Sequence, residues 1–206
     1  MTKLDGQRVF VVDDDAAVRD SIAELVESVG LQAEVYASAP EFLDAFERER
    51  PGCLVLDVRM AEMSGLVLQE RLNALEAGIP VIVLTAHGDV PMAVEAMKAG
   101  AVDFLQKPYR EQELLDSINA ALARDAASRR TSAVADDFER RLAALTERER
   151  EVLDHLLAGR TSKETARALG ISPRTAEVHR RNLLRKLGVG SAKELMRLAA
   201  SSGSGD

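Results

Sequence analysis

Short apolar runs alternate with amphipathic segments along the first 123 residues. The runs are rich in Val, Ile and Leu and end at polar residues, which is typical of strands buried on both faces of a parallel sheet. The predicted strands cover residues 8–13, 32–36, 52–57, 80–85 and 102–106, and the predicted helices cover 16–29, 39–49, 64–76, 90–99 and 111–123. Five such strand–helix units predict a doubly wound α/β fold with a five-stranded parallel sheet in the order 2-1-3-4-5.

A purely helical pattern follows further along the chain. The predicted helices there cover residues 147–158, 162–169, 173–187 and 191–199. Thr146 and Glu149 have the spacing of a capping box, and Ser162 and Ser172 stand where N-caps are expected. Gly170 supplies a tight turn between the second and third helices, so this region predicts an all-α helix-turn-helix domain of four helices.

The pattern divides the chain into four parts. We expect one domain over 1–123, a partly helical linker over 124–141, a helix-turn-helix domain over 142–200 and a flexible tail over 201–206. The linker is rich in Ala, Ser and charged residues but contains no Gly or Pro, so it could continue the helix before it.

Charge separates the two domains. Residues 1–145 carry 15 Lys and Arg against 26 Asp and Glu, a net charge of −11, whereas residues 146–199 carry a net charge of +5. A basic module joined to an acidic one indicates nucleic-acid binding in the second half only. No apolar run is long enough to span a membrane, the N-terminus lacks a signal sequence, and the single cysteine, Cys53, allows no internal disulfide, so we expect a cytoplasmic protein.

Polar side chains follow four of the predicted strands. Asp13 and Asp14 stand at the end of the first strand, Asp57 ends the third, Thr85 ends the fourth and Lys107 follows the fifth. Because ligands of open α/β sheets bind at the carboxyl ends of the strands, we expect these groups to converge. Clustered carboxylates suit Mg²⁺ or Mn²⁺, and a carboxylate beside such a cation, with Lys and Thr at hand, suits accepting a phosphoryl group.

Each of these residues also has an ordinary structural role open to it. Asp15, and with it the acidic run, could cap the following helix, and Asp57 could be a helix cap or a loop acid. Thr85 could be a strand-end hydroxyl, and Lys107 a solvated loop lysine. The joint occurrence of all four strand ends, in this order and spacing, favours the common site.

Residues 8–123 resemble the receiver domain of bacterial two-component response regulators, whose fold is flavodoxin-like. The resemblance implies that Asp57 is the phosphoacceptor and that Asp13, Asp14, Asp57 and the backbone carbonyl of Arg59 hold Mg²⁺. It also implies that Thr85 and Lys107 stabilise the phosphoryl group and that Phe104 is the switch aromatic. The run HGDVPMAVEAMKAGAVDFLQKP is similar to the FixJ-type branch of the family.

Two positions depart from the family pattern. Ala61 stands four residues after the acceptor, where the family usually has Pro, and Tyr109 replaces a more usual Phe after the Lys-Pro pair. The first departure could loosen the loop beside the acceptor and alter the lifetime of the phosphoryl group, although it removes no reacting group.

Residues 142–199 resemble the LuxR-type helix-turn-helix of NarL/FixJ response regulators. The resemblance and the polar face of helix 173–187 make Glu177, Val178 and Arg181 the candidates for base contacts in the major groove. The candidates for phosphate contacts are Lys163, Arg174, Thr175, Arg185 and Lys186. The N-termini of the helices at Ser162 and Ser172 can add anion contacts.

The sequence therefore predicts a transcription regulator controlled by phosphorylation. Its expected partners are a sensor histidine kinase, double-stranded promoter DNA, RNA polymerase and, after phosphorylation, a second copy of the chain, with no membrane contact. An aspartyl-phosphate phosphatase is the enzymatic alternative, but such enzymes carry the nucleophile on the first strand and need a cap domain. We expect phosphoryl uptake from the kinase and slow self-dephosphorylation as the only chemistry. A third interpretation makes the helix-turn-helix a protein adaptor, against which the basic helix argues.

Overall fold

A computed structural model describes residues 6–86 and 90–202 of the chain, the side chains of 198–202 excepted. The chain divides into two compact units, Met1–Arg129 and Arg130–Asp206. In the described ranges, no helix is both long and apolar enough to cross a membrane.

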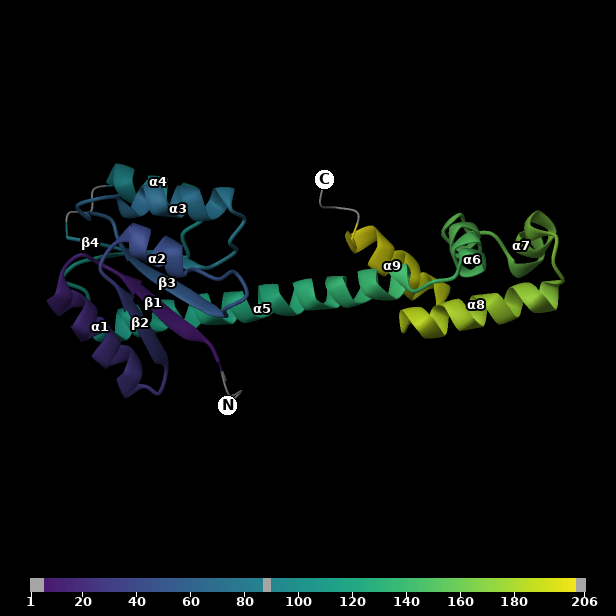
Figure 1. Ribbon diagram of the computed structural model, residues 1–206, viewed down its shortest axis with the longest axis horizontal. Helices are drawn as coiled ribbons and strands as arrows, with labels where there is room; N and C mark the ends of the chain where they lie inside the picture. Colours follow the sequence, from purple (N-terminus) through teal and green to yellow (C-terminus); the bar gives the residue numbers. More distant parts are fainter. Residues whose placement is uncertain (1–5, 87–89, 203–206) are drawn as a thin grey trace. The chain divides into compact units, whose positions relative to one another are not determined.

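The first unit is built on a parallel sheet (Figure 1). Its strands are β1 (Arg8–Val12), β2 (Gln32–Tyr36), β3 (Gly52–Asp57), β4 (Val81–Thr85) and β5 (Asp103–Gln106). Their order, β2-β1-β3-β4-β5, confirms the prediction. The strands β3 and β4 are buried along their whole length, which explains why their sequences are continuously apolar rather than alternating.

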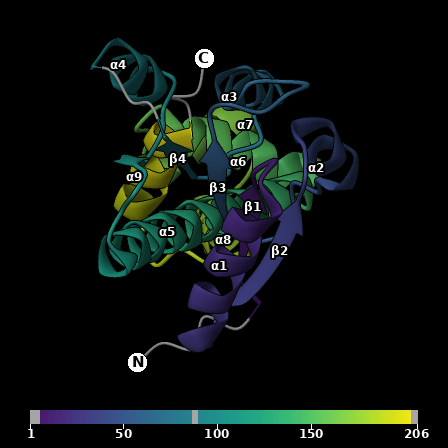
Figure 2. The same cartoon turned by 90° about the vertical axis from the view of Figure 1, so that its left-hand side faces the viewer.

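Helices cover both faces of this sheet, as Figure 2 shows in an end-on view. One face packs against α1 (Ala16–Ser28) and the first part of α5 (Glu111–Ala143), with Ile22, Val26, Leu114 and Ile118 in its core. The other face packs against α2 (Ala39–Ala45), α3 (Gly65–Ala74) and α4 (Val90–Lys98), with Phe42, Leu68, Leu72 and Ala96 in its core. Alternate residues of β1 supply the two cores, because successive side chains of a strand point to opposite faces.

Helix α5 is longer than the prediction of 111–123. It continues to Ala143 and contains the whole of the 124–141 stretch that we predicted to be only partly helical. Asp125 anchors it within the first unit, because its buried carboxylate accepts hydrogen bonds from the Gly52 amide at 3.0 Å and from Arg129 Nε. Arg129 in turn donates to the carbonyl oxygens of Arg48, Glu49 and Arg50. Such long-range contacts cannot be read from local periodicity.

The second unit is helical. It contains the end of α5 together with α6 (Glu147–Leu157), α7 (Ser162–Leu169), α8 (Pro173–Leu187) and α9 (Ala192–Ser202). Its core is made by Phe138, Leu145, Val152, Leu156, Leu183, Leu187, Val189 and Leu195. Of the predicted tail, residues 201 and 202 belong to α9, and 203–206 lie outside the described residues.

Helix caps in this unit follow the sequence with one exception. Thr146 and Glu149 form the predicted capping box of α6, and Ser172 caps α8. The prediction that Ser162 caps α7 was wrong, because the N-cap is Thr161. The Thr161 hydroxyl accepts from the Glu164 amide, and Glu164 Oε2 accepts from the Thr161 amide at 2.7 Å. The Thr-x-x-Glu spacing, which Ser162 lacks, decides where the helix begins.

Candidate functional site

The carboxyl edge of the sheet brings three of the predicted side chains into direct contact. Lys107 Nζ lies 2.6 Å from Asp13 Oδ2 and 2.7 Å from Asp57 Oδ1, so one ammonium group bridges two carboxylates. Both carboxylates are nearly inaccessible, with Asp13 2% and Asp57 6% exposed. Strand register produces this meeting, because β1 and β5 lie on opposite sides of the β3–β4 pair and end at the same edge.

The acceptor candidate is held by both of its oxygens. Asp57 Oδ1 accepts from Lys107, and Oδ2 accepts from the Arg59 amide at 2.6 Å. Burial nevertheless raises the pKa of Asp57 above its ordinary value, and the charge of Asp13 adds to this, while Lys107 and the Arg59 amide oppose it. The pKa of Lys107 is also raised, because its two carboxylate partners outweigh its own burial. The two carboxylates of Asp13 and Asp57 therefore carry more negative charge than the Lys107 ammonium neutralises.

Close packing supports the acceptor from behind. Gly65, the first residue of α3, donates its amide to the Val58 carbonyl at 2.9 Å. A side chain at position 65 would collide with the backbone carbonyl of Asp57. The glycine therefore lets α3 approach the end of β3 closely.

The other acidic residues of the run have different roles. Asp15 caps α1, because its side chain accepts from the Ala17 amide at 2.9 Å, which confirms the capping role left open for it. Asp14 is exposed, and its Oδ2 accepts from the Ala61 amide at 3.2 Å. Three adjacent carboxylates thus face three environments: a buried ion pair, a loop amide and a helix N-terminus.

Thr85 and Phe104 border the site from β4 and β5. Thr85 is completely buried, and its hydroxyl lies 4.0 Å from Met92 Sδ on α4. Its carbonyl accepts from the Lys107 amide at 2.8 Å, which joins the ends of β4 and β5. Phe104 is half-buried and packs against the core under α2, α3 and α4.

One further side chain lies at this edge and was not among the predicted site residues. Arg19 of α1 donates from Nη1 to the backbone carbonyl of Asp13 at 2.6 Å and so braces the end of β1. An arginine on the first turns of a helix is common, so the sequence carries no distinctive signal for this contact.

The donor set suits a hard divalent cation. Two buried carboxylates that already share one positive group are oxygen ligands of the kind that Mg²⁺ takes, and the ammonium marks where positive charge is needed. Within residues 6–86 and 90–202, however, no three side chains of His, Cys, Asp or Glu are grouped as a ready metal site. Asp14, the third predicted ligand, stands apart at the rim.

In the second unit, α8 presents the predicted polar face. The apolar spacing of α8 predicts that Ala176, Leu183, Leu184 and Leu187 face the core; Ala176, Leu183 and Leu187 are buried there, and Leu184 is half-buried. Seven of the eight candidate DNA contacts are exposed, namely Lys163, Arg174, Glu177, Val178, Arg181, Arg185 and Lys186. Thr175 is half-buried and its hydroxyl lies 2.8 Å from Ser172 Oγ at the start of the helix.

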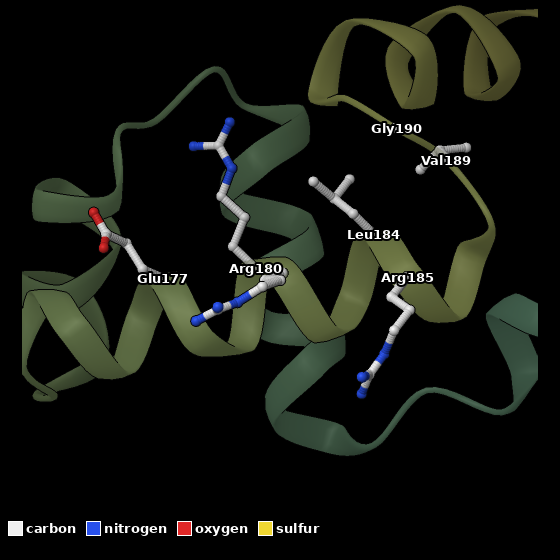
Figure 3. A pocket seen from close by; sticks show the side chains of 7 residues that line it. Glu177, Arg180, Leu184, Arg185, Val189 and Gly190 are labelled. Carbon is white, nitrogen blue, oxygen red and sulfur yellow. The ribbon is translucent and has the colours of Figure 1, made fainter.

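A shallow groove runs along this face and the turn after it (Figure 3). Leu184, Val189 and Gly190 form the end near the turn, and the charged side chains of Glu177, Arg180, Arg181 and Arg185 form the rest. Figure 3 shows Arg180 and Arg185 pointing away from α8 in different directions. Arg180 was not among the predicted contacts, although its place one turn after Glu177 could have indicated it.

Lys186 has a partner inside the unit. Its Nζ lies 2.7 Å from Glu149 Oε2, and the Glu149 side chain is 6% exposed. The Lys186 hydrogen bond, reinforced by those from Thr146, lowers the pKa of Glu149 to about 2. This ion pair fastens the start of α6 to the end of α8.

Comparison with known proteins decides the family. The model "Response regulator receiver domain" matches residues 9–119, and "Bacterial regulatory proteins, luxR family" matches residues 143–199. The chain belongs to the response regulators of two-component systems. It is a receiver domain joined to a LuxR-type DNA-binding domain, a combination found in transcription regulators.

Relatives of this response regulator match it over most of its length. It is 44% identical over 195 residues to the transcriptional regulatory protein FixJ of Bradyrhizobium diazoefficiens, covering 95% of both chains. It is 45% identical over 190 residues to the response regulator protein TodT of Pseudomonas putida, covering 92% of this chain and 84% of that one.

Solved structures agree with the sequence relatives. The response regulator StyR is 45% identical, with a TM-score of 0.86 over 95% of this chain and 99% of that one. Full-length FixJ from B. japonicum is 43% identical, with a TM-score of 0.59 over 100% of both chains.

Proposed function

We propose that this response regulator accepts a phosphoryl group on Asp57 and that the modification controls its dimerisation and its binding to promoter DNA. The observation that carries the proposal is the bridging of Asp57 and Asp13 by Lys107 in a buried setting. Two like charges that share one ammonium group are costly unless further positive charge is supplied, and among the described residues only Lys107 forms an ion pair with them.

The transfer uses an Asp57 oxygen as nucleophile. A bond forms between this oxygen and the phosphorus of a kinase phosphohistidine, while the bond from phosphorus to the histidine nitrogen breaks. Lys107 donates to Asp13 Oδ2 and to Asp57 Oδ1, which leaves one N–H of its ammonium group for the phosphoryl oxygens. The Arg59 amide keeps the carboxylate in one orientation.

Asp13, Asp14, Asp57 and the backbone carbonyl of Arg59 would hold a divalent cation, Mg²⁺ or Mn²⁺. When bound, it supplies the positive charge that neutralises the phosphoryl oxygens. Slow self-dephosphorylation is the only further chemistry that we assign.

The switch is assigned to Thr85 and Phe104. A phosphoryl group on Asp57 offers new acceptor oxygens to the buried Thr85 hydroxyl, which lies near Met92 of α4. Movement of Thr85 opens space that Phe104 can fill, and the surface formed by α4, β5 and α5 changes with it. That change favours pairing with a second copy.

Promoter recognition is assigned to α8. Arg181 donates to guanine, Glu177 accepts from cytosine N4 and Val178 contacts a thymine methyl group in the major groove. The phosphate contacts are assigned to Lys163, Arg174, Thr175, Arg185 and Lys186. The proposed setting is the cytoplasm, with a sensor histidine kinase as donor and RNA polymerase as a further contact.

Substitution of the acceptor tests this function. We expect Asp57→Asn to abolish phosphorylation by a small-molecule acyl or amido phosphate while leaving the fold intact, measured by intact-protein mass spectrometry and circular dichroism. Asp15→Asn is the matched control, because asparagine also caps helices and Asp15 lies outside the ion pair. Acid-labile phosphate retained by the Asp57 variant would contradict the assignment.

A further inference from the structure

The loop after β3 holds one of the acidic residues of the first strand end. The Ala61 amide donates to Asp14 Oδ2 at 3.2 Å, and the two residues are 47 positions apart in the sequence. Both residues are exposed. This bond ties the β1–α1 turn to the loop between β3 and α3.

The same bond separates Asp14 from its neighbours. Asp13 and Asp57 share the Lys107 ammonium, whereas no described side chain forms an ion pair with Asp14. The described residues include no group of three carboxylates close enough to hold a metal. Asp14 therefore has a resting partner, and that partner is a neutral backbone donor.

We propose that the Ala61 amide competes with the divalent cation for the Asp14 carboxylate and so sets the concentration at which the site loads. The inference rests on the proposed function, which makes Asp14 a ligand. A carboxylate that accepts an N–H gives up part of that interaction when a hard cation takes its oxygens. Ala61 is thus a positioning residue that acts through its backbone rather than its side chain.

The size of the effect follows from the bond. A hydrogen bond to a charged group contributes more than a neutral one, but this bond is long and exposed to solvent. We expect the apparent dissociation constant for the cation to fall about threefold to tenfold when the donor is removed. Any residue with an N–H at position 61 keeps the competition, and proline, which lacks the N–H, removes it.

The test removes one N–H donor from the full chain. Replacement of Ala61 by lactic acid through semisynthesis converts the amide to an ester, and Ala61→Pro removes the same donor by a different chemistry. Mn²⁺ binding is measured directly by electron paramagnetic resonance, with no phosphoryl donor present. Ala61→Gly is the control, because it retains the N–H and lacks only the methyl group, and its affinity should equal that of the wild type.

The outcomes separate this inference from the proposed function. Tighter Mn²⁺ binding by both donor-free variants, with an unchanged glycine variant, supports the competition. Weaker binding by those variants would mean that the amide orients Asp14 as a ligand, and unchanged binding would mean that the bond has no influence; either result overturns the inference and leaves the metal site standing. Absence of Mn²⁺ binding by the wild type would overturn both.

Discussion

Asp57 of the first unit and Glu149 of the other unit are matched in burial and in the type of partner. Asp57 is 6% and Glu149 5% exposed, and each lies 2.7 Å from a lysine ammonium. Their pKa values nevertheless move in opposite directions, up for Asp57 and down to about 2 for Glu149. A buried carboxylate with a salt bridge can therefore have either a raised or a lowered pKa.

Burial raises the pKa of both carboxylates, and the number of nearby charges and donors decides whether that effect is overcome. Glu149 Oε2 accepts from Lys186, from the Thr146 amide at 2.9 Å and from the Thr146 hydroxyl at 2.9 Å. It also stands in the first turn of α6, where the helix dipole favours an anion. Asp57 shares its ammonium with Asp13, whose negative charge repels it. Three donors stabilise the charge of Glu149, which joins α6 to α8, whereas Asp57 shares its ammonium partner with a second carboxylate and needs further positive charge.

The largest expected effect of this difference is on stability. We expect Glu149→Ala to lower the free energy of unfolding of the second unit by about 2–3 kcal/mol, because it removes a cap and a charge-assisted bond together. Asp57→Asn should not lower the free energy of unfolding of the first unit, because it removes a negative charge that Asp13 repels. Urea denaturation followed by circular dichroism measures both. Glu147→Ala, an exposed first-turn acid, is the control, and an equal loss from it would place the effect in helix charge alone.

Local sequence patterns predicted most elements of both units closely, although α5 continues past its predicted end at residue 123. The strand β3 begins and ends where its apolar run does, and α8 begins at its Ser-Pro signal and ends before Gly188. The convergence of Asp13, Asp57 and Lys107 was also predictable, because strand order places their ends together. Periodicity and caps are local signals, so they can be read from the sequence without knowledge of the tertiary structure.

Contacts between distant residues that strand order does not determine were not predictable. Lys186 was assigned to DNA phosphates from its charge, and nothing near it in the sequence indicates Glu149, 37 residues away. The bond from Ala61 to Asp14 joins a backbone amide to a side chain, and backbone donors leave no trace in a residue pattern. Both cases depend on where loops and helix ends meet after folding.

The same distinction separates the cations of α8. Arg181 forms no hydrogen bond or ion pair with any described residue, whereas Lys186 is bound to Glu149. We expect Arg181→Ala to weaken binding to a specific half-site by about 1–3 kcal/mol and to weaken nonspecific binding less. Fluorescence anisotropy with specific and scrambled duplexes measures both. Arg174 is an assigned phosphate contact, so Arg174→Ala should lose affinity equally for the two duplexes. An equal loss from Arg181→Ala would mean that Arg181 contacts a phosphate rather than a base.

Salt dependence sharpens the contrast between Arg185 and Lys186. A lost phosphate contact lowers the slope of log affinity against log salt by about 1. We expect Arg185→Gln to show this change, since its guanidinium is exposed and bonded only to Asn182 among the described residues. Lys186→Gln tests whether an ammonium held by Glu149 also reaches DNA. A reduced slope supports the proposed phosphate contact of Lys186. An unchanged slope with lower stability would mean that Lys186 serves only to bind Glu149.

The carboxylates of Glu149 and Asp57 should change the stability of the folded chain in opposite directions as the pH falls. The pKa of Glu149 is about 2 in the folded chain against an ordinary 4.5, so its contribution is complete above pH 4.5 and is lost as the pH falls toward 2. The wild type should therefore exceed Glu149→Gln in stability at neutral pH, and the difference in stability should narrow in acid.

The pKa of Asp57 is raised, so the folded chain binds the proton more tightly than the unfolded chain does. The wild type should be less stable than Asp57→Asn at neutral pH, and this gap should close as the pH falls through the folded pKa. Urea midpoints across the acid range measure both gaps, and gaps of the same sign would show that the two carboxylates do not differ as their surroundings indicate.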